Sequence, residues 1–359
     1  FSFSQAMNTS EITLNEAQST SGVSRRGRAM FNDSFAPVEW SFSTYMSPYT
    51  SAGGAQGTSG RGSTTDGNHC EVSEALWAMF FGQTVSDGLT SDTTNLDIKQ
   101  DQSAKATVGI FDLYFVLGAS QAASAYVYTA GAATANQMIY KISDCSVSEA
   151  SFDFDLDGIA TVNWSGNGKL IEEAGDTNFT TGNTLIYEGI SNTSGFIRNR
   201  VSDLTMEGDS GGGAGGGTDI AYTTTLTGGN ITMSNNLTYL TPETLGVVNQ
   251  PLGHVTGSKT IGGNFTCYLD SAGATSSAEL YEDLVEATTD IQNSFELTFD
   301  IGGSGTPHCI ITMPYAHLEV PTHSIDEVIS METNFHALPS TFDATDEINA
   351  FQFVGKDVS

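Results

Sequence analysis

One short run of residues matches a catalytic motif. Residues 208–212 read GDSGG, the nucleophile segment of serine proteases, and His69 with Cys70 faintly matches their histidine segment. Such catalysis needs a base and an orienting carboxylate that converge on the nucleophile, here Ser210. Ser210 lies in a run of glycine and alanine, and no alanine-rich strand precedes His69. A motif without its structural context is weak, so the sequence does not predict a protease.

Three aspartates at alternate positions could bind a metal or form an acidic strand face. Asp153, Asp155 and Asp157, followed by Gly158, match the first half of a calcium-binding EF-hand loop. The twelfth position of that loop should hold a bidentate glutamate, but it holds Trp164. A strand needs only the alternation with period two, so we favour the strand over the calcium site. The apolar residues of this alternation are Phe152, Phe154 and Leu156.

The remaining reactive side chains form no recognisable site. The six histidines show no metal-ligand spacing, and no particular pair of carboxylates stands out as a glycosidase pair. The four cysteines lack a CxxC pattern, which argues against a zinc ribbon or a redox dithiol; we expect buried free thiols, although pairing is not readable from sequence. We expect no catalytic residue, no metal ligand and no cofactor. The cysteines are Cys70, Cys145, Cys267 and Cys309.

The composition is typical of a soluble, folded, turn-rich β protein with a strong negative charge. The 359 residues contain 12 Lys and Arg against 42 Asp and Glu, a formal net charge of -30. This charge disfavours binding to nucleic acid or anionic membranes, which attract clustered cations. The 39 glycines indicate many turns, while 38% hydrophobic residues is too high for a disordered chain. The sequence contains no apolar run of membrane-spanning length, and its first residues show no secretory signal.

The second half of the chain repeats the order of elements in the first. Each copy reads as strand, turn-rich segment, strand, loop, helix and further strands, with Phe42 aligned to Phe265. Alternating apolar and polar residues predict half-buried strands, beginning with EITLNE at 11–16 and NITMSNN at 230–236. We expect each copy to be a domain of mostly antiparallel strands. The other matched strands are 38–46 with 261–269, 111–120 with 295–304, and 158–166 with 328–335.

Each copy contains one predicted helix at a matching place. In the first, residues 73–82 begin at Ser73 as N-cap and end at Gly82. In the second, Ser276 and Glu279 form a capping-box pattern before an amphipathic run. The matching dipeptides inside the two helices are Leu76-Trp77 and Leu280-Tyr281.

We place the first domain at residues 1–200 and the second at 201–359. The linker between them covers roughly 174–221, because its glycine-rich run cannot pack a core. The charge is uneven across this boundary: the second domain contains only two cations, Lys259 and Lys356.

The repeated order of elements, together with segments 150–166, 228–246 and 322–340, resembles tail tube proteins of long-tailed bacteriophages in their duplicated-domain form. The resemblance covers most of the chain except the linker and the loop at 47–68. It implies a mainly β fold of two tandem β-sandwich or barrel-like domains, each with one packed α-helix. It also implies that domains join through their sheets into a ring around a DNA channel, and that the rings stack.

The resemblance implies a structural virion protein rather than an enzyme. Three chains would form each pseudo-sixfold ring of a homo-oligomer in the phage tail, assembled in the bacterial host cytoplasm beside other tail proteins. DNA would pass through an acidic channel without specific binding, and no membrane would be involved. Repulsion between like charges suits this role. The candidate acidic row facing the channel is Asp153, Asp155 and Asp157.

Two loops are candidates for contacts between stacked rings, because a comparable long hairpin in the family reaches the adjacent ring. The first loop, 17–37, is basic, and a solvated loop is the alternative reading for it. The second, 237–260, would dock through apolar residues. The candidate contacts are Arg25, Arg26 and Arg28 in the first loop and Leu240, Leu245, Val247 and Val248 in the second.

Three alternatives remain open. A secreted or surface-displayed β-sandwich binding or adhesion module would suit the acidic composition, although Trp40, Trp77 and Trp164 all fall in predicted regular elements rather than in an exposed platform. A different two-domain virion component, such as a tail terminator or a capsid decoration protein, is the second. A hydrolase is the third, and the chain offers it no coherent triad, metal set or carboxylate pair.

Overall fold

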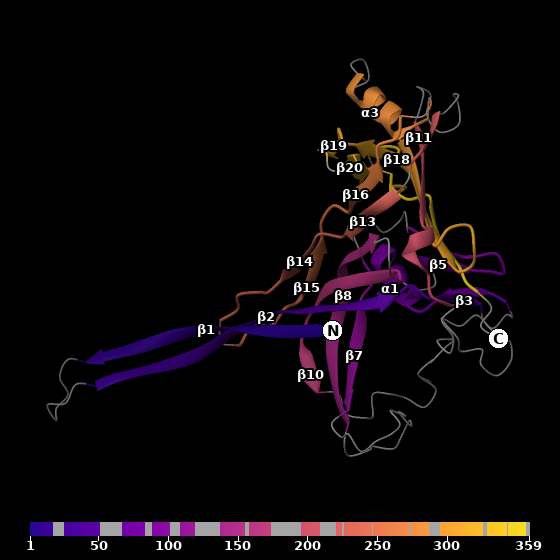
Figure 1. Ribbon diagram of the computed structural model, residues 1–359. Coiled ribbons are helices and arrows are strands. Elements are labelled where there is room, and N and C mark those ends of the chain that lie inside the picture. Colours follow the sequence, from indigo (N-terminus) through magenta and orange to yellow (C-terminus); the bar gives the residue numbers. More distant parts are fainter. Residues whose placement is uncertain are drawn as a thin grey trace.

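A computed structural model describes the chain except residues 17–24, 51–66, 83–87, 101–107, 119–136, 155–157, 174–194, 209–219, 225, 246, 272, 274, 287–294, 326–328, 343 and 357–359. The described part consists mainly of antiparallel strands with an α-helix in each half (Figure 1). This confirms the mainly β fold expected from the sequence. Neither helix is long and apolar enough to cross a membrane.

The strands of the first half are β1 (Ser2–Glu16), β2 (Arg25–Tyr45), β3 (Pro48–Thr50), β4 (His69–Glu71), β5 (Leu89–Ser91), β6 (Leu96–Ile98), β7 (Phe111–Gly118), β8 (Gln137–Phe154), β9 (Thr161–Gly168) and β10 (Ile171–Glu173). Those of the second half are β11 (Asp203–Gly208), β12 (Ile220–Thr223), β13 (Leu226–Ser234), β14 (Leu237–Leu240), β15 (Gly253–Thr256), β16 (Thr260–Tyr268), β17 (Phe295–Ile301), β18 (His308–Leu318), β19 (Thr322–Ile325), β20 (Ile329–Ala337) and β21 (Ala350–Val354). The helical elements are α1 (Glu74–Phe81), the 3-10 turn η3 (Asn199–Val201) and α3 (Ser277–Glu286).

One antiparallel sheet, which we call the joined sheet, runs through both halves. In the first half β1 pairs with β2, β2 with β9, and β9 with β8. In the second half the same order recurs, because β13 pairs with β16, β16 with β20, and β20 with β19. β8 also pairs with β13, with Phe152 opposite Ile231, so that the two halves share the sheet. Among the described strands, β1 and β19 stand at its two ends with one neighbour each.

A second layer covers the joined sheet and encloses the core. The first part of β8 pairs with β7 and β10, while β18 pairs with β17 and β21, and β17 with β11. Side chains alternate across each strand, so one side of every joined-sheet strand points into the core. Val162 and Trp164 of β9 are buried in this way, as are Phe265 of β16 and Phe335 of β20.

The two helices form as the sequence predicts, and they pack at matching places. In α3 the backbone N–H of Glu279 donates to Ser276 Oγ over 3.4 Å, which is half of the expected capping box. The Trp77 ring of α1 lies 5.7 Å from the ring of Phe152 on β8. In the second half Tyr281 of α3 takes the equivalent place, 4.6 Å from the ring of His323 on β19.

The C-terminal strand β21 completes the core of the first half. Its Phe351 ring lies 4.7 Å from that of Trp77, and Phe353 pairs with Leu96 of β6. All four cysteines are buried and free, as expected. Residues 203–208, inside the expected linker, form β11 with Leu204 and Met206 buried. The domain boundary near residue 200 stays a prediction.

Two expectations for the first hairpin are wrong. EITLNE does not form a half-buried strand, because Ile12 is 59% exposed on a ribbon that extends beyond the core. The segment 17–37 is not a loop throughout, because β2 already begins at Arg25. Alternation with period two requires no core, since a two-stranded ribbon in solvent satisfies it too. The strand pairing also matches Ile231 with Phe3 rather than Ile12, because Phe3 lies opposite Trp40 as Ile231 lies opposite Gly263.

Candidate functional site

The side of the joined sheet that points away from the core is a continuous surface of small polar side chains. Since residues directly opposite each other share a face, the strand registers define it. We call this surface the polar face. Its main members are Ser2 and Ser4 of β1, Glu39, Ser41 and Ser43 of β2, Asn163, Ser165 and Asn167 of β9, Glu149, Ser151 and Asp153 of β8, Asn230, Thr232 and Ser234 of β13, Asn264 and Thr266 of β16, Glu332, Asn334 and His336 of β20, and Thr322 and Ser324 of β19.

Neighbouring side chains on the polar face satisfy one another by hydrogen bonds. Ser43 Oγ donates to Asn163 Oδ1 over 2.7 Å. Asn264 Nδ2 donates to Glu332 Oε1 over 3.1 Å. Bonds of this kind hold short side chains close to the sheet and leave fewer donors for a passing molecule. The polar face is therefore a smooth surface rather than a set of projecting ligands.

The charge of the polar face has one sign. It contains four exposed carboxylates, those of Glu39, Glu149, Asp153 and Glu332, and no lysine or arginine among its described members. At physiological salt the field of such charges extends about 8 to 10 Å. A polyanion near this surface would be repelled, and no lysine or arginine among the described members of the polar face offers it a counter-charge.

At the edge of the polar face, Glu319 is held as an anion. Asn334 Nδ2 donates to Glu319 Oε2 over 2.8 Å, and His336 Nε2 lies 3.2 Å from Oε1. These two hydrogen bonds, that of Asn334 first, lower the pKa of Glu319 below its ordinary value. The edge beside β20 therefore keeps its negative charge.

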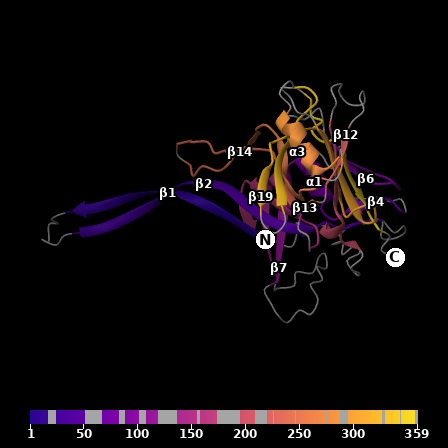
Figure 2. The same ribbon diagram turned by 45° about the horizontal axis from the view of Figure 1, so that its top comes forward.

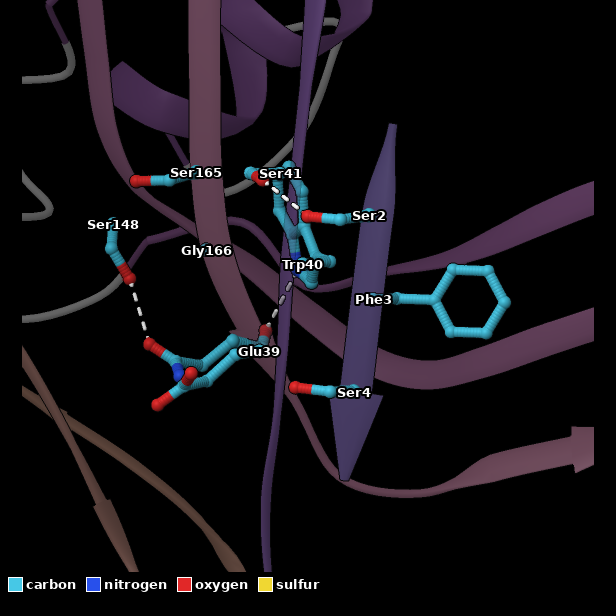
Figure 3. Close-up of a pocket in the computed structure, with 10 residues that line it drawn as sticks. Ser2, Phe3, Ser4, Glu39, Trp40, Ser41, Ser148, Ser165 and Gly166 are labelled. Atoms are coloured by element: carbon cyan, nitrogen blue, oxygen red, sulfur yellow. Dashed lines mark hydrogen bonds between the residues drawn. The ribbon is translucent and has the colours of Figure 1, made fainter. Parts of the chain in front are cut away.

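A hollow of about 380 Å³ interrupts the polar face between β1, β2 and β9 (Figure 3). Serine hydroxyls and the Glu39 carboxylate line it, and Ser2 and Ser41 are hydrogen-bonded across it over 2.8 Å. Trp40 contributes to its lining but is only 2% exposed, and its indole N–H donates to Asn167 O over 3.3 Å. Phe3, the other aromatic residue of the lining, is partly buried, and its ring stacks on that of Phe115 with 4.7 Å between the centroids.

The predicted acidic row is described in part. Phe152 is buried and Asp153 is exposed, as the strand interpretation expects, whereas Asp155 and Asp157 lie outside the described residues. In the described part of the chain, no three His, Cys, Asp or Glu side chains gather into a possible metal site.

The basic residues of the first hairpin lie on a projecting ribbon, which we call the long arm (residues 9–16 and 25–32). Figures 1 and 2 show that the outer part of β1 and β2 extends away from the rest of the molecule. Arg25 and Arg26 lie opposite Glu16 and Asn15. The Arg28 side chain is 72% exposed, and its Nη1 is 4.0 Å from Glu11 Oε1.

The predicted apolar contacts lie on a second hairpin, the short arm (residues 237–256), built from β14 and β15. Its turn is closed from both sides by one residue: Asn249 Nδ2 donates to Thr244 O over 3.2 Å, and Thr244 N donates to Asn249 Oδ1 over 3.0 Å. Two backbone hydrogen bonds fix the turn beside β2, because Asn249 N–H donates to Asp33 O over 3.0 Å and Asn249 O accepts the Phe35 N–H over 2.9 Å. The apolar side chains are exposed by 52% at Leu240, 100% at Leu245, 63% at Val247 and 44% at Val248.

The protease motif finds no support in the described residues. Ser210 lies outside them. His69 has a structural role, because its Nδ1 accepts the Gly355 backbone N–H over 2.8 Å and its Nε2 lies 3.3 Å from Thr93 O.

A buried carboxylate beside α1 was not predicted from the sequence. Glu71 Oε2 accepts the N–H of Ser73 over 2.6 Å and its hydroxyl over 2.7 Å, while Oε1 is buried without a partner. Burial raises the pKa of Glu71 to about 7. Its only sequence signal was a glutamate three residues before another, Glu74, ahead of an apolar helix. The polar face was missed as a unit as well, since only its alternating strands could be seen.

Comparison with known proteins gives an informative similarity. No protein-family model matches the chain. Over 356 residues, the chain is 28% identical to the tail tube protein pb6 of Escherichia phage T5, an alignment that covers 96% of this chain and 68% of that protein. This similarity confirms the resemblance to tail tube proteins of long-tailed bacteriophages and extends it over nearly the whole chain.

Proposed function

We propose that this relative of a phage tail tube protein is a structural, non-enzymatic virion protein whose copies close into rings and stack into the tail tube. The polar face lines the channel through which DNA leaves the particle. The protein is located in the virion tail, next to copies of itself and other tail proteins, and is assembled in the host cytoplasm.

The observation that carries this proposal is the pairing of β8 with β13. Within one chain, the end of the first half's sheet pairs with the beginning of the second half's sheet. β19 ends the sheet of the second half as β8 ends that of the first, and β1 begins the sheet of the first half as β13 begins that of the second. Among the described strands, β19 and β1 each have one edge without a partner. An open sheet edge is an aggregation hazard unless something covers it, and a closed ring covers every edge. We infer that β19 of one copy pairs with β1 of the next, as β8 pairs with β13.

The internal joint also predicts the register between copies. In the second half, Thr322 of β19 is followed across the sheet by Glu332 of β20 and Thr266 of β16. In the first half, Ser151 of β8 is followed in the same way by Asn163 of β9 and Ser43 of β2, so Thr322 and Ser151 are equivalent. Ser151 lies opposite Thr232, and Ser4 takes the place of Thr232. Thr322 of one copy should therefore lie opposite Ser4 of the next, with Ser324 opposite Ser2.

Two repeats per chain make a ring of three chains nearly sixfold. The joint inside the chain (β8 with β13) and the joint between chains (β19 with β1) use equivalent strands. Each ring would therefore alternate three joints inside chains with three joints between chains. All joints keep the polar face on the same side. The channel wall thus becomes a continuous lining whose described members include no lysine or arginine. It contains Asp153 in each first half, and we place Asp155 and Asp157 there as well.

The two arms are proposed as the contacts between rings. Arg25, Arg26 and Arg28 on the long arm would meet carboxylates of the adjacent, strongly acidic ring. The short arm would add apolar contacts, because its apolar side chains are exposed in their own chain. These side chains are Leu240, Leu245, Val247 and Val248.

The direct test is negative-stain electron microscopy of the purified protein over a concentration series. Rings or hollow tubes of uniform width are expected, and the rotational symmetry of the rings reports the number of chains. Compact monomers at every concentration would contradict the proposal and favour the surface binding module.

A disulfide test addresses the ring joint alone. The variant with Ser4→Cys and Thr322→Cys should form covalent oligomers that stop at the size of one closed ring, because every joint is then used. The control variant with Ser10→Cys and Thr322→Cys places one thiol on the long arm and should stay monomeric under denaturing conditions. Equal cross-linking of both variants would refute the register.

A further inference from the structure

A cavity outside the polar face combines an apolar wall with a single cation. It has a volume of about 470 Å³ and opens between α1, the segment after β15 and the segment after β20. Phe80 and Phe81 of α1 form its inner wall, and Leu338 and Phe342 stand at its exposed side. This volume is within the range of roughly 300–1,000 Å³ typical of binding pockets. We call it the Lys259 pocket.

Lys259 lacks an ionic partner among the described residues, although the chain has a large excess of carboxylates. Its Nζ lies 4.9 Å from the Phe81 ring centroid, and it takes part in none of the salt bridges of the described part. Burial lowers the pKa of Lys259 because desolvation disfavours the charged amine, and the charge of Glu347, which lines the same pocket without forming a salt bridge to Lys259, opposes this effect. A second polar group in the same lining, Thr345 Oγ, is buried without a hydrogen-bond partner. An incoming carboxylate would satisfy groups that the chain leaves unsatisfied.

The tip of the short arm carries the complementary chemistry. Leu245 is completely exposed, and the two hydrogen bonds between Thr244 and Asn249 hold the turn in one shape. Glu243, two residues before Leu245, is exposed as well. We propose that the Lys259 pocket receives the short-arm tip of a second copy, with Leu245 against the phenylalanine wall and Glu243 paired with Lys259.

The arm cannot fill the pocket of its own chain. Asn235 and Lys259, which line the pocket, flank the closed base of the short arm, whereas Leu245 lies at its opposite end. Backbone bonds to β2 hold the turn away from the base. The occupant must therefore come from another copy.

One tip and one pocket on every chain define a head-to-tail contact. A head-to-tail contact builds an open assembly when its rotation does not close. Because the ring joint already uses the closing contact, a tip that reaches a chain of the adjacent ring would build an open stack. The inference rests on the proposed function, since it names the receptor of the inter-ring contact, but it concerns stacking and not ring closure.

A charge exchange tests the pairing. Lys259→Glu alone and Glu243→Lys alone should each raise the protein concentration needed for tubes about tenfold, equivalent to about 1.4 kcal/mol per contact, and the double variant should return it to near the wild-type value. Lys356→Glu, which reverses the other cation of the second half, is the matched control and should have no effect on stacking. Rings counted by electron microscopy should be equally abundant in all variants.

A second measurement uses cysteine pairs, since the native thiols are buried. The variant with Leu245→Cys and Ala344→Cys should give an open ladder of cross-linked chains, whereas Leu245→Cys with Val320→Cys should not. The proposal would be overturned if the wild type forms stacked tubes, the double charge variant does not restore stacking, and the Leu245→Cys, Ala344→Cys variant gives no ladder. If the ladder forms but no rings are seen, the contact stands and the proposed ring function is wrong.

Discussion

At the scale of single residues, Glu71 shows how a buried group couples stability to pH. The ordinary carboxyl pKa of 4.5 is raised to about 7 by burial, so the folded protein holds a proton that the unfolded chain releases between these values. The folded state then binds more protons than the unfolded state, and stability falls as pH rises from about 4.5 to about 7. Below this interval the contribution is fully present, and above it the loss is complete.

Glu71→Gln should remove this loss, because the amide stays neutral at every pH. At pH 8 the variant should be more stable than the wild type, by on the order of 3 kcal/mol at most, while at pH 4.5 the two should be similar. Denaturant unfolding at both pH values measures this. Glu39→Gln, which removes one exposed carboxylate, is the control. Equal pH dependence in wild type and Glu71→Gln would contradict the prediction.

Gly166 is the second residue with a sharp prediction. A Cβ there would collide with Ser146 O and the Trp40 ring, in the middle of the joined sheet. Gly166→Ala should lower the free energy of unfolding by about 1–3 kcal/mol, the usual effect of overpacking. Gly27→Ala is the matched control, because the space around Gly27 is open. Thermal unfolding compares the two, and similar losses in both would show that the collision is relieved.

At the scale of elements, local sequence patterns predicted where helices and strands form, but not which strands are buried or paired. The helix at α1 was readable from the apolar run between Ser73 and Gly82, although the Ser73 hydroxyl makes no cap hydrogen bond and donates to Glu71 instead. The pattern of EITLNE predicted a strand correctly but misplaced its burial, because burial depends on which other elements lie nearby. The pairing of β8 with β13 was not predicted, since no residue in either strand encodes the choice of a distant partner.

The long arm carries a prediction of its own. Reversing its charge with Arg25→Glu, Arg26→Glu and Arg28→Glu should block stacking, because the arm would then repel an acidic neighbouring ring. The matched control replaces the same three residues with lysine, which keeps the charge and should keep the tubes. Electron microscopy of rings and tubes is the measurement. Normal tubes from the glutamate variant would show that the long arm is only a solvated ribbon.

At the scale of the whole molecule, the composition predicted a negatively charged surface that repels DNA, but not where on the molecule this surface lies. The net charge of -30 disfavours a grip on DNA, and the described members of the polar face include no lysine or arginine. Asp153 was picked out correctly as an exposed acid of a strand. Glu39, Glu149 and Glu332 were not, because they come from separate strands that only the register brings to one face.

The lining predicts how tubes treat DNA. Wild-type tubes should not retain duplex DNA in co-sedimentation at low salt. Tubes with Glu39→Lys, Glu149→Lys and Asp153→Lys should retain it, and the binding should fall steeply as salt is added, because counterions are released from the phosphates. The control places lysines at Glu172, Glu173 and Glu282, which are exposed carboxylates off the polar face. Equal retention by both variants would indicate that the polar face does not line the channel.

The position of β21 has a consequence for how the protein is made. The Phe351 ring packs edge-on against the Trp77 ring, and Phe353 pairs with Leu96. The core of the first half therefore needs residues of β21, which come late in the sequence. While a ribosome is still translating the second half, the first half lacks this strand and has no finished core to fold around. A chain that stops before β21 should therefore leave Trp77 and Leu96 without these contacts and the core of the first half incomplete.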